Sequence, residues 1–316
     1  MMATREAYGI ALAQLGEENK NIVVLDADLS KSTKTAVFKE KCPERFLNAG
    51  IAEANMMTVA AGIATTGKTV FASTFAIFAA GRAFEQIRNS IAYPKLNVKI
   101  GATHAGITVG EDGASHQAIE DIALMRSVPN MTVINPADEA ETKQAIKAAA
   151  ELDGPVYLRL GRLNAPDIFD ESYRYEIGKG VQVAEGNDAT IIATGIMVSE
   201  ALEARDILAE KGIGVRVINI HTIKPIDADI IVKAAKETGA IVTAEEHNII
   251  GGLGSAVAEV LCESCPVKMS RVGVKDIFGR SGTPSELMEM YGLTSENIVN
   301  AVLDMVQSSE DRAQCF

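Results

Sequence analysis

The fold of this chain is clearest in the stretch Val98-Lys-Ile-Gly-Ala-Thr103, which runs directly into His104-Ala-Gly-Ile-Thr-Val-Gly-Glu-Asp112-Gly-Ala-Ser-His116. The first six residues are mostly apolar or small and predict a buried strand. The next thirteen hold three glycines, two carboxylates and two of the chain's four histidines. Glycines let the backbone approach a ligand closely, while imidazole and carboxylate groups transfer protons and bind hydroxyls. The segment is therefore either a ligand site at a strand end or a solvated loop whose glycines only make turns.

The same alternation of short apolar runs and longer amphipathic segments extends to both sides. Buried parallel strands are predicted at 22–25, 69–71, 98–100, 131–134 and 156–160. Helices are predicted between them, for example at 4–15 and at 138–150, where Asp138 complements the helix N-terminus. This order of elements predicts a doubly wound α/β sheet.

The pattern pauses between 164 and 187, where glycines and a proline interrupt any helical period. A second, shorter series follows, with strands at 189–193, 215–220, 240–244 and 267–272 and helices at 198–211, 227–238, 254–261 and 295–306. We therefore expect a first domain at 1–165, a linker at 166–187 and a second domain at 188–316. Each domain is expected to be a mainly parallel sheet with helices on both faces.

Composition restricts the classes of partner. The 316 residues include 30 basic and 42 acidic side chains, giving a net charge of -12, which repels nucleic acid and anionic membrane surfaces. A phosphorylated metabolite remains open, because a few arginines and histidines can bind one phosphate locally. The sequence shows neither a signal-like start nor a run long enough to span a membrane, so a cytoplasmic protein is expected.

Two smaller patterns have structural alternatives. The cysteines at 42, 262, 265 and 315 have no second pair or histidine cluster to complete a zinc site, and we expect reduced thiols, with a redox role for Cys262 and Cys265 left open. The sequence Gly251-Gly-Leu-Gly254 does not complete a dinucleotide-binding motif, and a tight turn before a helix is the favoured interpretation.

Five motifs, taken in order, resemble the C-terminal half of transketolase over almost the whole chain: Ile51-Ala-Glu53-Ala-Asn55-Met, Ser73-Thr-Phe75-Ala-Ile-Phe78, Gly110-Glu-Asp112-Gly-Ala-Ser-His116-Gln, Arg126-Ser-Val-Pro129-Asn and Thr222-Ile-Lys-Pro225. The resemblance implies a pyrimidine-binding domain followed by a transketolase C-terminal domain. The chain lacks the Gly-Asp-Gly motif with a downstream Asn that holds diphosphate and magnesium in thiamine-diphosphate enzymes.

That combination implies one half of a split transketolase. Its N-terminal partner subunit would carry the diphosphate-binding domain and the ligands of Mg²⁺, so this chain is expected to supply no metal ligand. The resemblance also implies an assembly of two copies of each chain, with thiamine diphosphate as cofactor.

By resemblance, Glu53 is the glutamate that binds the pyrimidine N1' and is catalytic. Phe78, and less directly Phe75, would contact the aminopyrimidine ring, where an aromatic face offers stacking area. Considered without the resemblance, Glu53 is equally an exposed helix-start residue and the two phenylalanines are core residues.

The remaining site residues are also matched by resemblance. His104 corresponds to a histidine near the sugar phosphate, Asp112 to the carboxylate that binds the donor C2 hydroxyl, and His116 to a catalytic-loop residue that moves a proton. Phosphate contacts are implied for Arg5, Ser32 and Arg162. Guanidinium groups suit this role because they bind phosphate oxygens bidentately and stay charged.

The resemblance implies ketol transfer in the pentose phosphate pathway, with a two-carbon unit passing from a ketose phosphate such as xylulose 5-phosphate to an aldose phosphate such as ribose 5-phosphate. One alternative is the beta chain of a 2-oxo-acid dehydrogenase, which shares the fold but has no use for a phosphosugar set. Deoxyxylulose-phosphate synthase is normally one longer chain. A non-catalytic regulatory or scaffold subunit would need none of Glu53, Phe78, Asp112 and His116.

Overall fold

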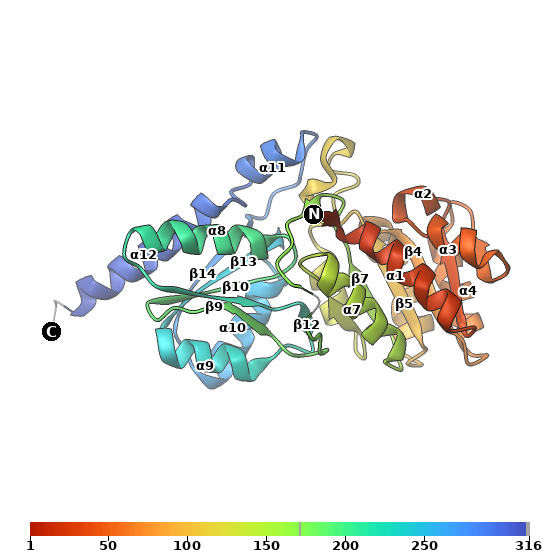
Figure 1. Cartoon of the computed structure of the whole chain (residues 1–316), viewed down its shortest axis with the longest axis horizontal. Coiled ribbons are helices and arrows are strands. Elements are labelled where there is room, and N and C mark those ends of the chain that lie inside the picture. Colours follow the sequence, from red (N-terminus) through yellow and green to blue (C-terminus); the bar gives the residue numbers. More distant parts are fainter. Residues whose placement is uncertain (171, 314–316) are drawn as a thin grey trace.

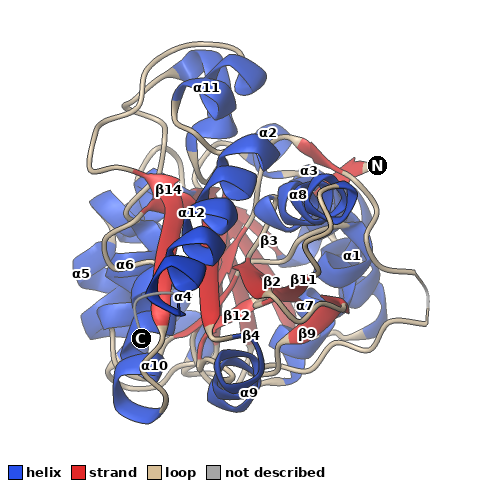
Figure 2. Ribbon diagram, turned by 90° about the vertical axis from the view of Figure 1, so that its left-hand side faces the viewer, coloured by secondary structure: helices blue, strands red, loops and turns tan. Residues whose placement is uncertain are grey.

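The computed structural model describes the backbone of residues 1–170 and 172–313, and side chains as far as residue 306 at the C-terminal end. Two α/β units lie side by side, one formed by the first half of the chain and one by the second (Figure 1). Each has a central sheet with helices against both faces (Figure 2). The α/β class and the two-unit arrangement predicted from the sequence are confirmed.

The first sheet has seven strands in the order β12-β6-β7-β5-β4-β2-β3. Its parallel strands are β2 (Ile22–Asp26), β3 (Phe46–Asn48), β4 (Thr69–Phe75), β5 (Val98–Thr103), β6 (Thr132–Ile134) and β7 (Val156–Arg159). In β2, Val23 and Leu25 pack into the core on one face of the sheet, while Ile22 and Val24 pack into the core on the other. A strand covered on both faces has to be apolar throughout, which is why these runs are visible in the sequence.

Helices cover both faces of this sheet. One face carries α4 (Glu53–Ala64), α5 (Phe84–Gln86) and α6 (Asp121–Ser127), with π-helical segments at Phe78–Arg82 and Ile87–Ala92. The other carries α1 (Thr4–Glu18), α3 (Ala36–Lys41) and α7 (Glu139–Glu151). Short elements complete the unit: β1 (Met2–Ala3), α2 (Ser30–Thr33), 3-10 turns at Pro43–Arg45 and Ile107–Asp112, and β8 (Asn164–Ala165), which pairs with β1.

The second sheet has five strands in the order β14-β13-β10-β11-β9. Its parallel strands are β10 (Ala189–Ala193), β11 (Val215–Asn219), β13 (Ala240–Asn248) and β14 (Lys268–Val274). The helices α8 (Met197–Glu210) and α12 (Ser295–Ala313) lie on one face, and α9 (Ala228–Thr238) and α10 (Leu253–Ser264) on the other. The remaining helix, α11 (Pro284–Met290), reaches across to the first unit beside the 3-10 turn that follows β5 (Figure 1).

Two strands depart from the predicted division. The segment expected to be a linker contains β9 (Val181–Ala184), a strand that the sequence did not predict and that pairs antiparallel with β11. The strand β12 (Thr222–Lys224) follows β11 in sequence but pairs with β6 of the first sheet. The exact limits 1–165 and 188–316 stay predictions.

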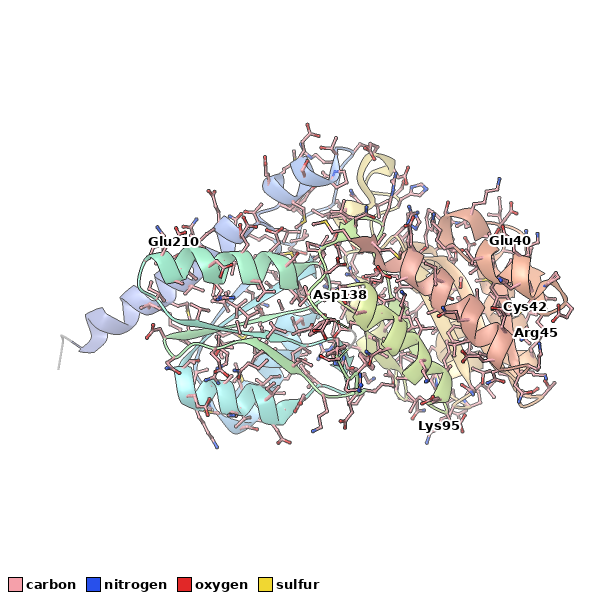
Figure 3. All side chains as sticks on the ribbon, viewed as in Figure 1. Glu40, Cys42, Arg45, Lys95, Asp138 and Glu210 are labelled. Atoms are coloured by element: carbon pink, nitrogen blue, oxygen red, sulfur yellow. The ribbon has the colours of Figure 1, made fainter. Side chains whose placement is uncertain are left out.

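The helix starts follow local chemistry. The carboxylate of Asp138, which lies where the two units meet (Figure 3), caps α7 by accepting a hydrogen bond from the Glu141 amide at 2.8 Å. Its other oxygen accepts from the amides of Ile168 and Phe169 in the connecting segment.

Within the described residues, no helix combines the length and apolar character that crossing a membrane requires.

Candidate active site

The predicted site residues gather at the carboxyl ends of the strands of the first sheet, which form one edge of it. Phe75 is the last residue of β4, His104 follows β5, and Arg162 follows β7. Arg5 and Glu53 lie in the first turns of α1 and α4, two helices that lead into β2 and β4 and therefore begin at that same edge. Ligands of open parallel sheets bind at the carboxyl ends of the strands, which is where these side chains meet.

Arg5 joins two other predicted residues. Its Nη1 donates to the backbone oxygen of Ser32 at 3.2 Å and to Nε2 of His104 at 2.9 Å. Burial lowers the pKa of Arg5 from its usual value, and nearby Arg162 lowers it further, which places both guanidinium groups in one electrostatic environment. The structure thus brings these four residues together as a group with excess positive charge.

His104 is a neutral imidazole in this group. Burial lowers its pKa to about 3, and the charges of Arg5 and Arg162 act in the same direction. Because Arg5 donates to Nε2, the ring proton lies on Nδ1 and points to Thr103 Oγ1, 2.9 Å away. The backbone of His104 has a φ of +57°, which is uncommon for a residue with a side chain. His104 therefore orients Arg5 rather than adding positive charge.

Four rings pack together next to this group. Phe75 stacks on His104 with ring centres 3.8 Å apart, and on Phe78 at 5.6 Å. The His116 ring meets Phe78 edge-on at 5.4 Å. Phe75 ends a strand and Phe78 begins the π-helical segment, and the two rings touch.

Glu53 reaches the ring cluster through a residue that sequence reasoning missed. Its side chain is 5% exposed, and its Oε1 accepts a hydrogen bond from Arg82 Nη1 at 3.1 Å. The Arg82 guanidinium also lies over the Phe78 ring, 4.0 Å from its centre. No periodic pattern marks Arg82 in the sequence, because it lies in a π-helical segment whose turns are wider than those of an α-helix.

Arg162 connects the strand end to the loop that contains Asp112. Its Nη1 donates to the carbonyl of Val109 and lies 3.5 Å from Asp112 Oδ2. Both side chains are partly exposed, Arg162 by 37% and Asp112 by 45%. A carboxylate next to a partly exposed guanidinium can accept from a ligand hydroxyl while the guanidinium binds a ligand anion.

Two of the loop glycines lie close to residues of the second unit. Gly106, Gly110 and Gly113 all have positive φ, as expected. A Cβ on Gly106 would lie 2.2 Å from the carboxyl carbon of Glu246, and one on Gly113 would lie 2.6 Å from Ser281 Oγ. Gly106 and Gly113 therefore lie close against the second unit of the chain. The amide of Thr108 donates to Glu246 Oε1 at 2.7 Å, which anchors the loop there.

The two minor sequence patterns have clear places. The first amides of α10, those of Leu253 and Gly254, donate to the buried carboxylate of Glu245. That helix N-terminus is therefore satisfied internally, as a structural turn requires. Cys262 lies in the last turn of α10 and Cys265 at its end, both as free thiols, while Cys315 lies outside the described residues.

Family models match both halves of the chain. Residues 1–167 match the transketolase pyrimidine-binding domain, and residues 178–298 match the transketolase C-terminal domain.

Three relatives extend the comparison. A putative transketolase C-terminal section from Methanocaldococcus jannaschii is 55% identical over 303 residues, covering 95% of both chains. A 6-deoxy-6-sulfo-D-fructose transketolase subunit from Clostridium sp. (strain MSTE9) is 44% identical and covers 98% of this chain and 96% of its own. A solved split-gene transketolase, described as an inactive β4 tetramer, superposes with a TM-score of 0.91 at 59% identity over 97% of this chain and 99% of its own. This chain therefore belongs to the transketolase family, of which it carries the pyrimidine-binding and C-terminal domains that form the C-terminal half.

Proposed function

We propose that this chain is the pyrimidine-binding subunit of a split, thiamine-diphosphate-dependent transketolase. Together with an N-terminal subunit it would transfer a two-carbon ketol unit from a ketose phosphate to an aldose phosphate, in the cytoplasm. The observation that carries the proposal is a continuous series of contacts along one sheet edge, from Glu53 through Arg82, Phe78, Phe75 and His104 to Arg5 and Ser32.

The residues at one end of this series fit an aminopyrimidine ring. A buried carboxyl group beside an aromatic face offers one hydrogen bond and one stacking surface. When bound, thiamine diphosphate supplies a thiazolium carbon that becomes a nucleophile toward the donor carbonyl. Glu53 would hold the proton shared with pyrimidine N1', and Phe78, backed by Phe75, would hold the ring in place.

The other end of the series fits a sugar with an anionic terminus. Arg5 and Arg162 would bind the phosphate oxygens, with Ser32 adding a contact and neutral His104 holding Arg5 in position. Asp112 would accept from the donor C2 hydroxyl. His116, in edge contact with Phe78, would move a proton at the donor oxygen.

The diphosphate and Mg²⁺ would be held by the partner chain. The described part of this chain contains no group of three or more His, Cys, Asp and Glu side chains placed to bind a metal. We propose two copies of each chain in the active assembly. The inactive β4 form of the split-gene relative supports the view that this kind of chain needs its partner for activity.

The donor sugar has a second candidate. One relative is named as a subunit that acts on 6-deoxy-6-sulfo-D-fructose, whose sulfonate is an anion of similar shape to phosphate. Arg5 and Arg162 suit either anion, so the geometry favours an anionic sugar class. A 2-oxo-acid dehydrogenase beta chain or a scaffold subunit would leave this arginine pair without a ligand.

The decisive experiment compares the chain alone with the chain mixed with a separately expressed subunit that carries the diphosphate motif. Turnover of xylulose 5-phosphate with ribose 5-phosphate, in the presence of thiamine diphosphate and Mg²⁺, should require both chains. The same mixture is then offered 6-deoxy-6-sulfofructose as donor. Full activity of the single chain would refute the split assembly, and no activity with either donor would refute the transketolase reaction.

A further inference from the structure

Arg82 makes, within the chain itself, both of the contacts expected of a bound aminopyrimidine. Its guanidinium, a planar group, donates to Glu53 Oε1 at 3.1 Å, and its Cζ lies over the Phe78 ring, 4.0 Å from the ring centre. A pyrimidine ring would need a hydrogen bond to the same carboxyl group and stacking on the same ring. The guanidinium therefore uses the two partners that the aminopyrimidine ring would need.

Two other rings contact Phe78. Phe75 lies in a nearly parallel stack with an interplanar angle of 15°, and His116 meets the ring edge-on. Phe75 is held by a further contact, since it stacks on the buried His104. Of the groups on Phe78, Arg82 is the one with an exposed side chain.

The Arg82 side chain is exposed enough to move away from Glu53 and Phe78. Its side chain is 55% exposed, although its partner Glu53 is buried. An ion pair with one exposed partner and a cation–π contact at the surface are both weak, so ligand binding can replace them. Arg82 also ends the π-helical segment that Phe78 begins, and such wide turns frequently occur at functional sites.

We propose that Arg82 is a gate of the pyrimidine site. Its guanidinium takes the place of the aminopyrimidine ring against Glu53 and Phe78 when no cofactor is bound, and swings out toward solvent when the ring enters. The gate gives the buried Glu53 carboxyl a partner in the cofactor-free chain, and it weakens cofactor binding by the contacts that must first be broken. This inference rests on the proposed function of the site.

The test measures cofactor affinity and not turnover. Thiamine diphosphate with Mg²⁺ is titrated calorimetrically into the two-chain complex made with the wild-type chain, Arg82→Ala, Arg82→Lys or Arg88→Ala. Arg88 is the matched control, because it is exposed in the neighbouring π-helical segment and its side chain bonds Asn89. Melting curves of the four complexes establish that all are folded.

Arg82→Ala should lower the Kd for thiamine diphosphate about fivefold to tenfold, because no gate contacts have to be broken. Arg82→Lys keeps a charge near Glu53 but loses the planar guanidinium, so its Kd should lie between those of wild type and Arg82→Ala. Arg88→Ala should equal wild type. When Glu53→Gln is introduced into the wild-type chain and into Arg82→Ala, the increase in thiamine diphosphate affinity caused by Arg82→Ala should become smaller.

Two failures can be told apart. Equal or weaker binding by Arg82→Ala in a complex whose wild-type form binds the cofactor overturns the gate and leaves the proposed function intact. A wild-type complex that binds no thiamine diphosphate overturns both. A crystal structure of the loaded complex with the guanidinium still on Phe78 would likewise overturn the gate.

Discussion

The guanidinium of Arg5 donates to His104 Nε2 at 2.9 Å, so two predicted substrate-binding residues form one unit. A charged hydrogen bond to a ligand contributes about 1.5–3 kcal/mol, so Arg5→Ala should raise KM for a phosphorylated donor about 10- to 100-fold, with a smaller effect on kcat. The same donor without its phosphate is the control, because its KM should barely change. Equal losses for both donors would remove the phosphate role.

His104 should respond differently to two substitutions. His104→Asn keeps a side chain that tolerates the φ of +57° and that can still accept from Arg5, so its KM for the phosphorylated donor should rise less than that of His104→Ala. Steady-state kinetics of the two variants beside wild type make the comparison. Indistinguishable KM values would mean that His104 does not orient Arg5.

Gly106 should be intolerant of any side chain. Its φ of +81° strains an L-residue, and an added Cβ would meet the Glu246 carboxyl carbon at 2.2 Å. Gly106→Ala should therefore lower the free energy of unfolding by about 3–5 kcal/mol. Gly67→Ala is the matched control, because Gly67 has a φ of +83° with nothing within 4 Å of the new Cβ, and strain alone should cost about 1–2 kcal/mol. Urea unfolding of both variants measures the difference. Equal losses of stability would mean that the loop or the Glu246 side chain moves to make room for the new Cβ.

The buried ion pair of Asp121 and Arg159 should be sensitive to removal of one partner. Arg159 Nε donates to Asp121 Oδ2 at 2.9 Å, and its Nη2 donates to backbone carbonyls, including that of Glu246. Asp121→Ala leaves the guanidinium buried without its counter-charge, which should destabilise the chain by about 3–5 kcal/mol. Removing the partly exposed pair of Lys143 and Glu139 by Glu139→Ala should cost about 0.5 kcal/mol or less. Thermal or urea unfolding measures the stability of both variants. Similar losses of stability would contradict the expectation that the buried ion pair matters more than the partly exposed one.

Glu141 should give the stability a pH dependence. It accepts hydrogen bonds from Tyr173 and from Asn219 of β11, yet burial raises its pKa from 4.5 to about 7. Between those two values the folded chain holds a proton that the unfolded chain has released. The contribution of Glu141 is therefore complete below about pH 4.5 and is lost as the pH rises through about 7, a change of about 3 kcal/mol.

Urea unfolding at several pH values between 4.5 and 7.5 tests this for wild type and Glu141→Gln. Subtracting the two curves isolates Glu141 from the other titrating groups. The difference should fall with rising pH across that range. A flat difference would mean that the folded and unfolded chains bind this proton equally.

Burial explains how much of the fold was visible in the sequence. Runs such as 22–25 are covered on both faces and must be apolar, so they predicted strands at the right places. The strand β9 is half-buried at a sheet edge and β12 is three residues long, so neither leaves a clear pattern. Short polar elements such as α2 are fixed by their surroundings, since Asp26 accepts hydrogen bonds from Thr33 and Thr35.

The site was only partly predictable for a related reason. Strand ends marked His104 and Arg162, and the family motifs supplied roles for them. The partner of Gly106 is Glu246, far away in sequence, and no local pattern can reveal such a contact. The π-helical turn that brings Arg82 onto Phe78 also has no simple periodic signature.

The strand β12 comes from the second half of the chain but is part of the sheet of the first half. Its pairing with β6 covers that strand on one side of the first sheet, and Lys224 adds hydrogen bonds to the carbonyls of Arg126 and Val128. A fragment ending within 166–187 would leave the backbone groups of β6 open to pairing with other molecules, a known route to aggregation. We expect the intact chain to unfold in one cooperative transition. A chain break between the two units would therefore separate the first sheet from its own edge strand.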